Sequence, residues 1–269
     1  MRVAFRKMHG LSNDFVVLDA RAHSLPPITR AIAAALADRN TGIGCDQLIL
    51  LEPSDEAAFA MRIFNADGGE VEACGNAARA VALLHGEAVE VETKGGRIAF
   101  EPFKGGARVD MGRPRFAWDA IPLACEANTL SLPAKWDGLP SPVAVNVGNP
   151  HVVFFANRLT SLPVSELGPA IENDPLFPER INVNFAQVTG RQTIDLVVWE
   201  RSAGLTRACG TGACATAVAA IRLGLVESPV TVTLPGGTLR IEWSADAPIV
   251  MSGPATEAFR GEFEWDDYA

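Results

Sequence analysis

Cys74 and Cys209 are the residues of this 269-residue chain whose type and surroundings best suit acid–base chemistry. Each is followed by glycine, then by a good capping residue, Asn76 or Thr211, and then by an alanine-rich stretch without proline. This order predicts that each cysteine lies just before a helix. The unpaired N–H groups and the positive dipole end at a helix start lower the pKa of a nearby thiol from its usual ~8.5 and attract carboxylates. We therefore expect two reactive thiols, each beside an anion-binding helix end.

The two cysteines occupy equivalent places in an internal repeat. The stretch FNADGGEVEACGNAARAVA, residues 64–82, aligns without a gap to WERSAGLTRACGTGACATA, residues 199–217, at an offset of 209 − 74 = 135. Residues 13–17 and 149–153 match in the same order at an offset of 149 − 13 = 136. One cysteine in an alanine-rich context is more often a buried, inert residue. Two at matched places predict two homologous halves that contribute one thiol each.

Two opposed thiols suit the inversion of a carbon acid. A carboxylate held by two helix starts would leave its α-carbon between two sulfurs, so that a thiolate removes the α-proton and a thiol protonates the opposite face. This chemistry requires no cofactor. With four histidines and no Cys or His pair at metal-ligand spacing, we expect no metal site. The glycine-rich elements could instead cradle phosphate, but neither carries a lysine in the register of a P-loop.

The elements that position the thiols follow from periodicity and composition. Helices are expected over residues 76–84 and 211–223, and an amphipathic helix over 28–38 with Thr29 as its N-cap. Runs of β-branched and aromatic residues predict strands over 15–18, 47–51, 89–93, 143–147, 151–155, 193–199 and 230–234. Because strands outnumber helices, we predict an α+β fold of two pseudo-symmetric halves, each a curved, mostly antiparallel sheet around a central helix, with the active site in the cleft between them. The Pro- and Gly-containing region 112–122 places the halves at residues 1–117 and 118–257.

Composition excludes several classes of protein. A net charge of −9 argues against nucleic acid as a partner, since nucleic-acid binding needs a basic surface. The chain has no apolar run long enough to cross a bilayer and no signal peptide at its start, so we expect a cytoplasmic protein without membrane contact. Five cysteines in this length do not form a disulfide framework.

Polar residues beside the strands are candidates for holding a substrate. Four asparagines end or interrupt strand-like segments: Asn13, Asn65, Asn149 and Asn182. Taken singly, an asparagine in such a place is more often a turn residue. The adjacent Glu200 and Arg201 could meet the ammonium and carboxylate groups of an amino acid, or form a surface ion pair. His151 could orient or tune a cysteine, or fill a turn.

With these residues assembled, the sequence closely resembles the diaminopimelate epimerase family. The resemblance covers essentially the whole chain through KMHGLSNDFVVLD, TGIGCDQL, FNADGGEVEACGNAAR, NVGNPHVVF, PERINVNF and VWERSAGLTRACGTGACATA, in that order. It implies that Cys74 and Cys209 transfer protons and that His151 and Glu200 tune them. It also implies a set of residues that contact diaminopimelate: Asn13, Gln47, Asn65, Gly75, Asn76, Asn149, Asn182, Glu200, Arg201, Gly210 and Thr211. Ser12, Ala77 and Ser202 depart from the family pattern, which most often has glycine there.

The resemblance also carries expectations about the whole protein. The family has two pseudo-symmetric halves with the substrate in the cleft, and its last residues, here about 258–269, return to the first half. It uses neither pyridoxal phosphate nor a metal and usually forms homodimers. Proline and hydroxyproline racemases share the fold but have histidine after the first Cys-Gly, where this chain has Asn76. A non-catalytic amino-acid-binding module and a redox disulfide protein are the alternatives from other classes.

Overall fold

The computed structural model describes residues 1–72, 74–133, 136 and 138–268. It divides into two compact units: unit 1 comprises Met1–Val109 with Gly253–Ala269, and unit 2 comprises Asp110–Ser252. Both boundaries lie earlier in the chain than the positions 117/118 and 257/258 expected from the sequence. The backbone of Arg115 explains the first difference, because it exchanges hydrogen bonds of 2.7 and 3.0 Å with the backbone of Asn146 in unit 2. The segment with Pro and Gly is thus built into unit 2.

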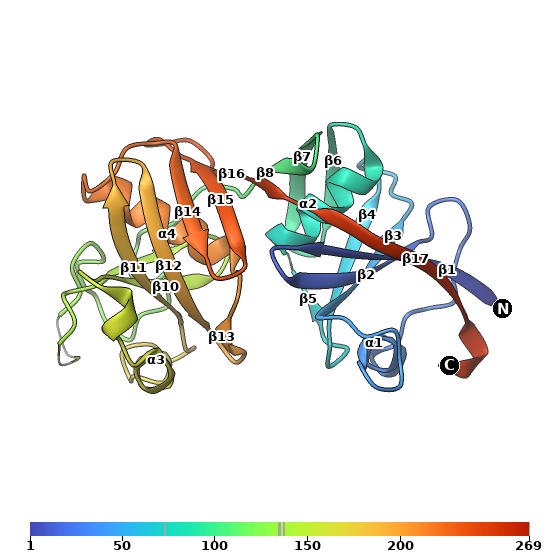
Figure 1. Ribbon diagram of the computed structural model, residues 1–269, viewed down its shortest axis with the longest axis horizontal. Helices are drawn as coiled ribbons and strands as arrows, with labels where there is room; N and C mark the ends of the chain where they lie inside the picture. The colour runs from blue at the N-terminus through green and yellow to red at the C-terminus, as the bar shows by residue number, and fades with distance from the viewer. Residues whose placement is uncertain (73, 134–135, 137, 269) are drawn as a thin grey trace. The chain divides into compact units, whose positions relative to one another are not determined.

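Unit 1 is a mixed sheet with two α-helices among its described residues (Figure 1). Its strands are β1 (Arg2–Gly10), β2 (Asn13–Asp19), β3 (Gln47–Glu52), β4 (Ala60–Asn65), β5 (Glu70–Val71), β6 (Val89–Thr93), β7 (Gly96–Phe103), β8 (Gly106–Asp110) and β17 (Thr256–Glu264), with α1 (Arg30–Ala37), α2 (Gly75–His85) and the 3₁₀ turn η2 (Trp265–Asp267). Neighbouring strands pair antiparallel except for β2 with β3 and β4 with β6, which are parallel. The C-terminal strand β17 pairs with β1 along its whole length, from Arg2 opposite Glu264 to His9 opposite Thr256.

Unit 2 repeats this pattern. Its strands are β9 (Val143–Asn146), β10 (Pro150–Phe155), β11 (Asn182–Gly190), β12 (Thr193–Glu200), β13 (Gly204–Thr206), β14 (Val230–Leu234), β15 (Gly237–Glu242) and β16 (Val250–Pro254), with η1 (Leu159–Ser161), α3 (Val164–Glu172) and α4 (Gly210–Arg222). The parallel pairs are β10 with β11 and β12 with β14, which correspond to those of unit 1, and the other pairs are antiparallel.

The strand registers of the two units agree with the internal repeat. Phe15 lies opposite Gln47 in the parallel pair of unit 1, and His151 lies opposite Asn182 in that of unit 2. These residues are related by the offsets of 136 and 135 that the sequence showed. The predicted α+β fold of two similar halves, each with a mostly antiparallel sheet around a helix, is confirmed.

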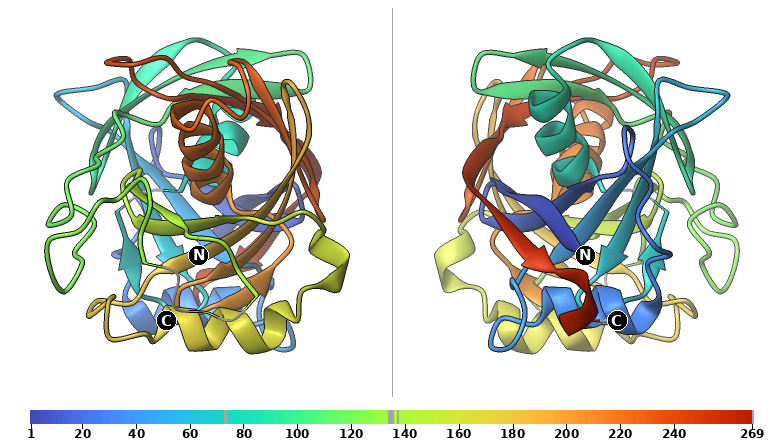
Figure 2. Two further views of the ribbon diagram at one scale, coloured as in Figure 1. Left: turned by 90° about the vertical axis from the view of Figure 1, so that its left-hand side faces the viewer. Right: turned by 90° about the vertical axis from the view of Figure 1, so that its right-hand side faces the viewer.

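Each unit is built around one helix of small residues. Figure 2 shows α4 enclosed by the strands of its unit in the left view and α2 enclosed by those of its unit in the right view. Alanine and glycine dominate both helices, and most of their residues are fully buried, as Ala78 and Ala215 are. Small side chains let the surrounding strands approach a helix closely, so an alanine-rich helix can occupy the centre of a sheet that curves around it. No helix among the described residues is long and apolar enough to cross a membrane.

The starts of the helices confirm one capping prediction and correct another. Thr29 is the N-cap of α1, and its hydroxyl accepts a hydrogen bond from the backbone N–H of Ile32. In the other two cases, the N-cap is the cysteine itself, Cys74 for α2 and Cys209 for α4. The residues expected to cap, Asn76 and Thr211, lie one position inside the first turn, so the thiols are closer to the helix ends than the sequence suggested.

Candidate active site

The backbone holds both cysteines in the same conformation. Cys74 has φ −147° and ψ 111°, and Cys209 has φ −130° and ψ 109°. Their carbonyl groups accept the first helical hydrogen bonds, from Ala78 at 2.9 Å and Ala213 at 3.0 Å. The N–H groups of the next three residues in each helix, which include Gly75–Asn76 and Gly210–Thr211, therefore have no partner from within the helix. Each unit thus combines a thiol with a helix start suited to binding an anion.

Cys74 lies beside two asparagine side chains of unit 1. Its thiol donates a long hydrogen bond to Asn13 Oδ1, with 3.9 Å between sulfur and oxygen. The same oxygen accepts from Asn76 Nδ2 at 3.1 Å. Two of the residues expected to contact substrate, Asn13 and Asn76, are therefore next to the first thiol.

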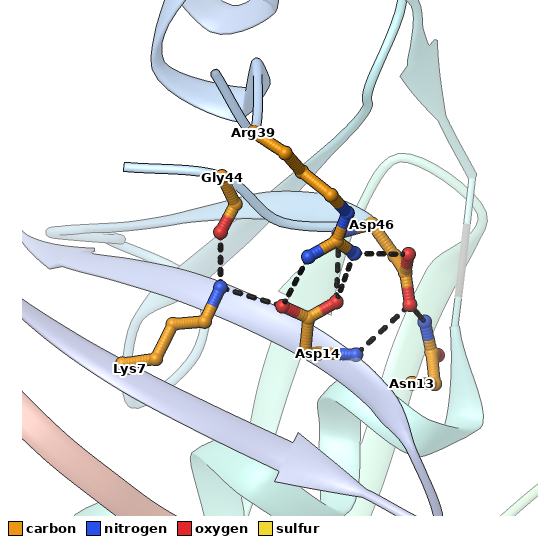
Figure 3. A network of polar contacts seen from close by, with 6 residues as sticks. All are labelled: Lys7, Asn13, Asp14, Arg39, Gly44 and Asp46. Atoms are coloured by element: carbon orange, nitrogen blue, oxygen red, sulfur yellow. Dashed lines mark hydrogen bonds and ion pairs between the residues drawn. The ribbon is translucent and has the colours of Figure 1, made fainter. Parts of the chain in front are cut away.

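Asn13 is hydrogen-bonded to a network of charged side chains (Figure 3). Asn13 Nδ2 and the backbone N–H of Asp14 both donate to Asp46 Oδ2, each at 3.0 Å. The guanidinium of Arg39 bridges Asp46 and Asp14, with contacts of 2.8 and 2.6 Å, and Lys7 pairs with Asp14 and donates to the carbonyl of Gly44. The cations Arg39 and Lys7 hold the pKa of Asp14 well below its usual range, against a burial that would raise it. Asp14 is therefore ionised at every pH at which the protein would work.

Gln47 and Asn65 form a second polar pair in unit 1. They lie opposite each other on β3 and β4, and Gln47 Nε2 donates to Asn65 Oδ1 at 2.9 Å. Asn65 is exposed, whereas the other oxygen of the pair, Gln47 Oε1, is buried without a partner among the described residues. These two side chains support each other at the ends of neighbouring strands.

Cys209 is more deeply buried than Cys74. Its sulfur accepts from the backbone N–H of Gly212 at 3.3 Å and lies 3.5 Å from the hydroxyl of Thr211. Burial and the nearby carboxylate of Glu200 raise the pKa of the Cys209 thiol well above its ordinary value, and the contacts with Thr211 and Gly212 only partly offset this. The prediction that the helix start lowers this pKa is therefore wrong for Cys209. Burial destabilises the thiolate by more free energy than the N–H groups at the helix start restore. With its pKa raised in this way, Cys209 is protonated at neutral pH.

Glu200 and Arg201 follow directly from β12. Glu200 Oε1 accepts from the hydroxyl of Thr206 at 2.5 Å, and its charge acts on Cys209 as described. The backbone N–H of Arg201 donates to Asn182 Oδ1 at 3.0 Å, and its guanidinium donates to the carbonyl of Glu179 at 3.1 Å. The charge of Glu200 thus raises the pKa of Cys209, and its role in tuning a catalytic thiol stays a prediction.

His151 and Asn182 form hydrogen bonds with other polar groups of unit 2. His151 is fully buried, which lowers its pKa to about 3, so the imidazole is neutral. Its Nε2 lies 2.9 Å from Asn149 Oδ1 and its Nδ1 lies 3.0 Å from Asn184 Nδ2. Asn182 Nδ2 donates to the carbonyl of Pro150 at 2.8 Å, so its amide joins the segment of Asn149 to that of Arg201. The ring nitrogens of His151 thus contact Asn149 and Asn184 rather than a thiol.

The residues of these networks that sequence reasoning missed include Asp46, which contacts Asn13, and Asn184, which contacts His151. Asp46 directly precedes Gln47 in the motif TGIGCDQL, and Asn184 lies two positions after Asn182 and therefore on the same face of β11. Asn184 is completely buried between Val183 and Phe185 in β11, and a polar residue between two apolar residues of a strand was the available signal. Among the described residues, no group of three or more His, Cys, Asp or Glu side chains is placed to hold a metal ion.

Comparisons with known proteins agree on one family. The family model described as diaminopimelate epimerase matches residues 5–117 and 143–257. Among curated relatives, the diaminopimelate epimerase of Erythrobacter litoralis is 70% identical over 100% of both chains, and that of Sphingopyxis alaskensis is 60% identical over 98% of both. A solved hydroxyproline epimerase from Agrobacterium vitis, with bound trans-4-hydroxy-L-proline, has a TM-score of 0.66 and 13% identity, covering 97% of this chain and 92% of its own, which shows a shared fold. Since the family model spans most of the chain and the relatives align along its full length, this protein belongs to the diaminopimelate epimerase family.

Proposed function

We propose that this protein is an isomerase that interconverts LL- and meso-diaminopimelate by removing the proton from one face of the α-carbon and adding another proton to the opposite face, with Cys74 and Cys209 as its acid and base. The observation that carries the proposal is the matched pair of thiols, each the N-cap of the central helix of its unit and with nearly equal backbone angles. The full-length identity to diaminopimelate epimerases supports the choice of substrate.

The proposed reaction balances without a cofactor. The thiolate of one cysteine takes the α-proton and becomes a thiol, while the thiol of the other gives its proton to the opposite face of the same carbon and becomes a thiolate. The N–H groups of Gly75–Asn76 and Gly210–Thr211, which have no partner within their helices, would stabilise the charge that develops on the carboxylate. Because Cys209 is protonated before substrate binds, it would act as the proton donor for the isomer that binds to this form of the enzyme.

The remaining expectations belong to the same proposal. The side chains of Asn13, Gln47, Asn65, Asn149, Asn182, Glu200 and Arg201 would contact the amino acid. The enzyme would work in the cytoplasm as a homodimer, independently of pyridoxal phosphate, on the route to lysine and peptidoglycan precursors. A net charge of −9 is compatible with this substrate, because the local donors named above can hold a carboxylate inside an acidic protein.

The deciding experiment follows deuterium from solvent into substrate. Reduced protein is incubated in D₂O with LL-diaminopimelate, and in parallel with L-proline, and both label and configuration at the α-carbon are measured. We expect label and inversion with diaminopimelate alone. Activity on proline alone would favour a racemase of the same fold. No label with either amino acid would support a binding module or a redox protein and would overturn the proposal.

A further inference from the structure

Asn13 and Asn149 occupy equivalent positions in the two units. Each lies two residues before the first paired residue of a parallel strand pair. That residue is Phe15, opposite Gln47, in unit 1 and His151, opposite Asn182, in unit 2. An asparagine side chain has one acceptor and one donor end, and the hydrogen bonds of its neighbours decide which end faces outward. The neighbours of these two asparagines differ.

In unit 1 the amide of Asn13 is anchored by a carboxylate. A carboxylate only accepts, so the atom of Asn13 that contacts Asp46 must be Nδ2, and Oδ1 must point toward Cys74 and Asn76. Asn76 does not fix this orientation independently, because its own Oδ1 is buried without a partner among the described residues and its amide could turn together with that of Asn13. The acceptor end of Asn13 therefore faces the thiol because of Asp46.

In unit 2 the anchor is a backbone carbonyl. Asn184 Nδ2 donates to the carbonyl of Val152 at 3.1 Å, which fixes that amide, and its second N–H points to His151 Nδ1 at 3.0 Å. Nδ1 must then be the accepting nitrogen of the neutral ring, so the ring proton is on Nε2. This proton goes to Asn149 Oδ1, which leaves Nδ2 as the outward end of Asn149.

The two anchors come from different positions in the repeat. At an offset of 135, the position of Asp46 is occupied in unit 2 by buried Ile181, and the position of Asn184 is occupied in unit 1 by buried Ile49. Each unit thus has an apolar side chain where the other has its anchor. The two asparagines therefore differ in amide orientation because the residues at these matched positions differ between the units.

We propose that Asp46 and Asn184 are positioning residues that hold Asn13 and Asn149 with opposite amide orientations, so that unit 1 presents a hydrogen-bond acceptor and unit 2 presents a donor. Such a pair distinguishes an ammonium group, which only donates, from a carboxylate, which only accepts. The consequence for substrate recognition rests on the proposed function. The amide orientations themselves do not, and they can be measured in the absence of substrate.

The anchor of unit 1 is tested by two variants with the same charge. In Asp46→Asn the backbone N–H of Asp14 still directs an oxygen of residue 46 toward Asn13, whereas Asp46→Ala has no acceptor. The pH dependence of Cys74 alkylation by iodoacetamide is followed by peptide mass spectrometry in the full-length chain. We expect the midpoint for Asp46→Ala to lie about one pH unit below that for Asp46→Asn, because a released Asn13 can turn an N–H toward the thiolate. Equal midpoints would show that only the charge of Asp46 matters and would overturn the proposal for unit 1.

Arg39→Gln is the matched control. It removes the guanidinium that bridges Asp14 and Asp46 but leaves the contact between Asp46 and Asn13. The melting temperature of this variant is expected to fall, because the ion pairs of Arg39 with Asp14 and Asp46 are lost. The alkylation midpoint should remain within about 0.3 pH units of the wild-type value, since the lost charge is largely exposed and screened. A shift as large as that of Asp46→Ala would assign the effect to the charged network and would count against a role for the amide.

The anchor of unit 2 is tested by the tautomer of His151. In protein labelled with ¹⁵N-histidine, we expect one neutral ring with its proton on Nε2, assigned by its loss in His151→Gln. In Asn184→Leu the ring should populate both tautomers, and kcat/KM for diaminopimelate should fall about tenfold or more, since misplaced contacts lose this much. A wild-type ring protonated on Nδ1 would overturn the proposal for unit 2, even if the protein is an active epimerase. A correct tautomer in a protein without epimerase activity would instead refute the proposed function.

Discussion

The sulfur of Cys209 accepts a hydrogen bond from the backbone N–H of Gly212, three residues further along the chain, at 3.3 Å. This bond favours a thiolate, yet the pKa of Cys209 is raised, first by burial and then by the charge of Glu200. The start of α4 therefore contains opposing influences on one thiol. Of the two that raise its pKa, burial and the carboxylate, the carboxylate is the one that a single substitution can remove.

Glu200→Gln should lower the pKa of Cys209. The carboxylate repels the thiolate and so raises this pKa, and its removal should shift the midpoint of Cys209 alkylation down by about one pH unit. Thr206→Val is the control, because it removes the 2.5 Å hydrogen bond to Glu200 but keeps the charge. If both variants shift the midpoint equally, the hydrogen bond rather than the charge controls the thiol.

Cys74→Ala and Cys209→Ala should each reduce epimerisation by about 10³-fold or more, because each removes one of the two proton-transfer groups. Cys125→Ala, at an exposed cysteine of unit 2, is the matched control and should retain full activity. The measurement is the rate of α-deuterium incorporation from D₂O into either isomer. Normal turnover by either of the first two variants would refute the two-base mechanism.

His151 should make the stability of unit 2 depend on pH. Its pKa is lowered from 6.5 to about 3 by burial, so below pH ~6.5 the unfolded chain binds a proton that the folded protein does not. Stability from this group is therefore present above pH ~6.5 and is lost as the pH falls toward 3, at about 1.4 kcal/mol per pH unit.

Urea unfolding of the wild type and His151→Gln at several pH values between 7.5 and 4.5 measures this dependence. The stability difference between the two proteins should change in favour of the variant as the pH falls. A difference that stays constant with pH would show that the imidazole is not held neutral in the folded state.

Gly212 should tolerate no side chain, in contrast to its counterpart in unit 1. A Cβ at Gly212 would lie 2.7 Å from Asn184 Oδ1, 3.1 Å from Val198 Cγ2 and 3.2 Å from Cys209 Sγ. Gly212→Ala should therefore cost about 1–3 kcal/mol and disturb both Asn184 and the thiol. Ala77, at the equivalent place, already carries this methyl group while fully buried.

The paired experiment compares thermal unfolding of Gly212→Ala with that of Ala77→Gly. The first should also change the pH profile of Cys209 alkylation. The second should cost about 1 kcal/mol through helix propensity and lost packing, without affecting that profile. An unchanged profile in Gly212→Ala would mean that the start of α4 can move to accommodate the methyl group.

The elements found from sequence are those whose local signal was strong. β6 and β14 begin and end where the β-branched runs 89–93 and 230–234 do, and α2 and α4 differ from prediction by one residue at each end. The helix α3 was missed because Gly168 and Pro169 interrupt it. Gly168 is explained by tertiary packing, since a Cβ there would lie 2.5 Å from the ring of Trp199. The close packing of α3 against β12 therefore requires a residue of low helix propensity at this position.

The site divides in a similar way. The repeat identified both cysteines, because their spacing is a property of the chain. Asp46 and Asn184 were missed because their effect depends on which atom of a neighbouring amide they contact across strands. The direction of the pKa shift of Cys209 was missed because burial of the thiol depends on packing around α4 that the repeat does not encode.

The pairing of β17 with β1 affects the order in which the chain can fold during synthesis. Unit 2 is one continuous segment, Asp110–Ser252, whereas unit 1 needs Gly253–Ala269 to complete its sheet. A ribosome therefore releases every residue of the second unit before it releases the last strand of the first. Since domains fold as units while the chain emerges, we expect unit 2 to fold first and β1 to pair with β17 only after residues 253–264 have emerged.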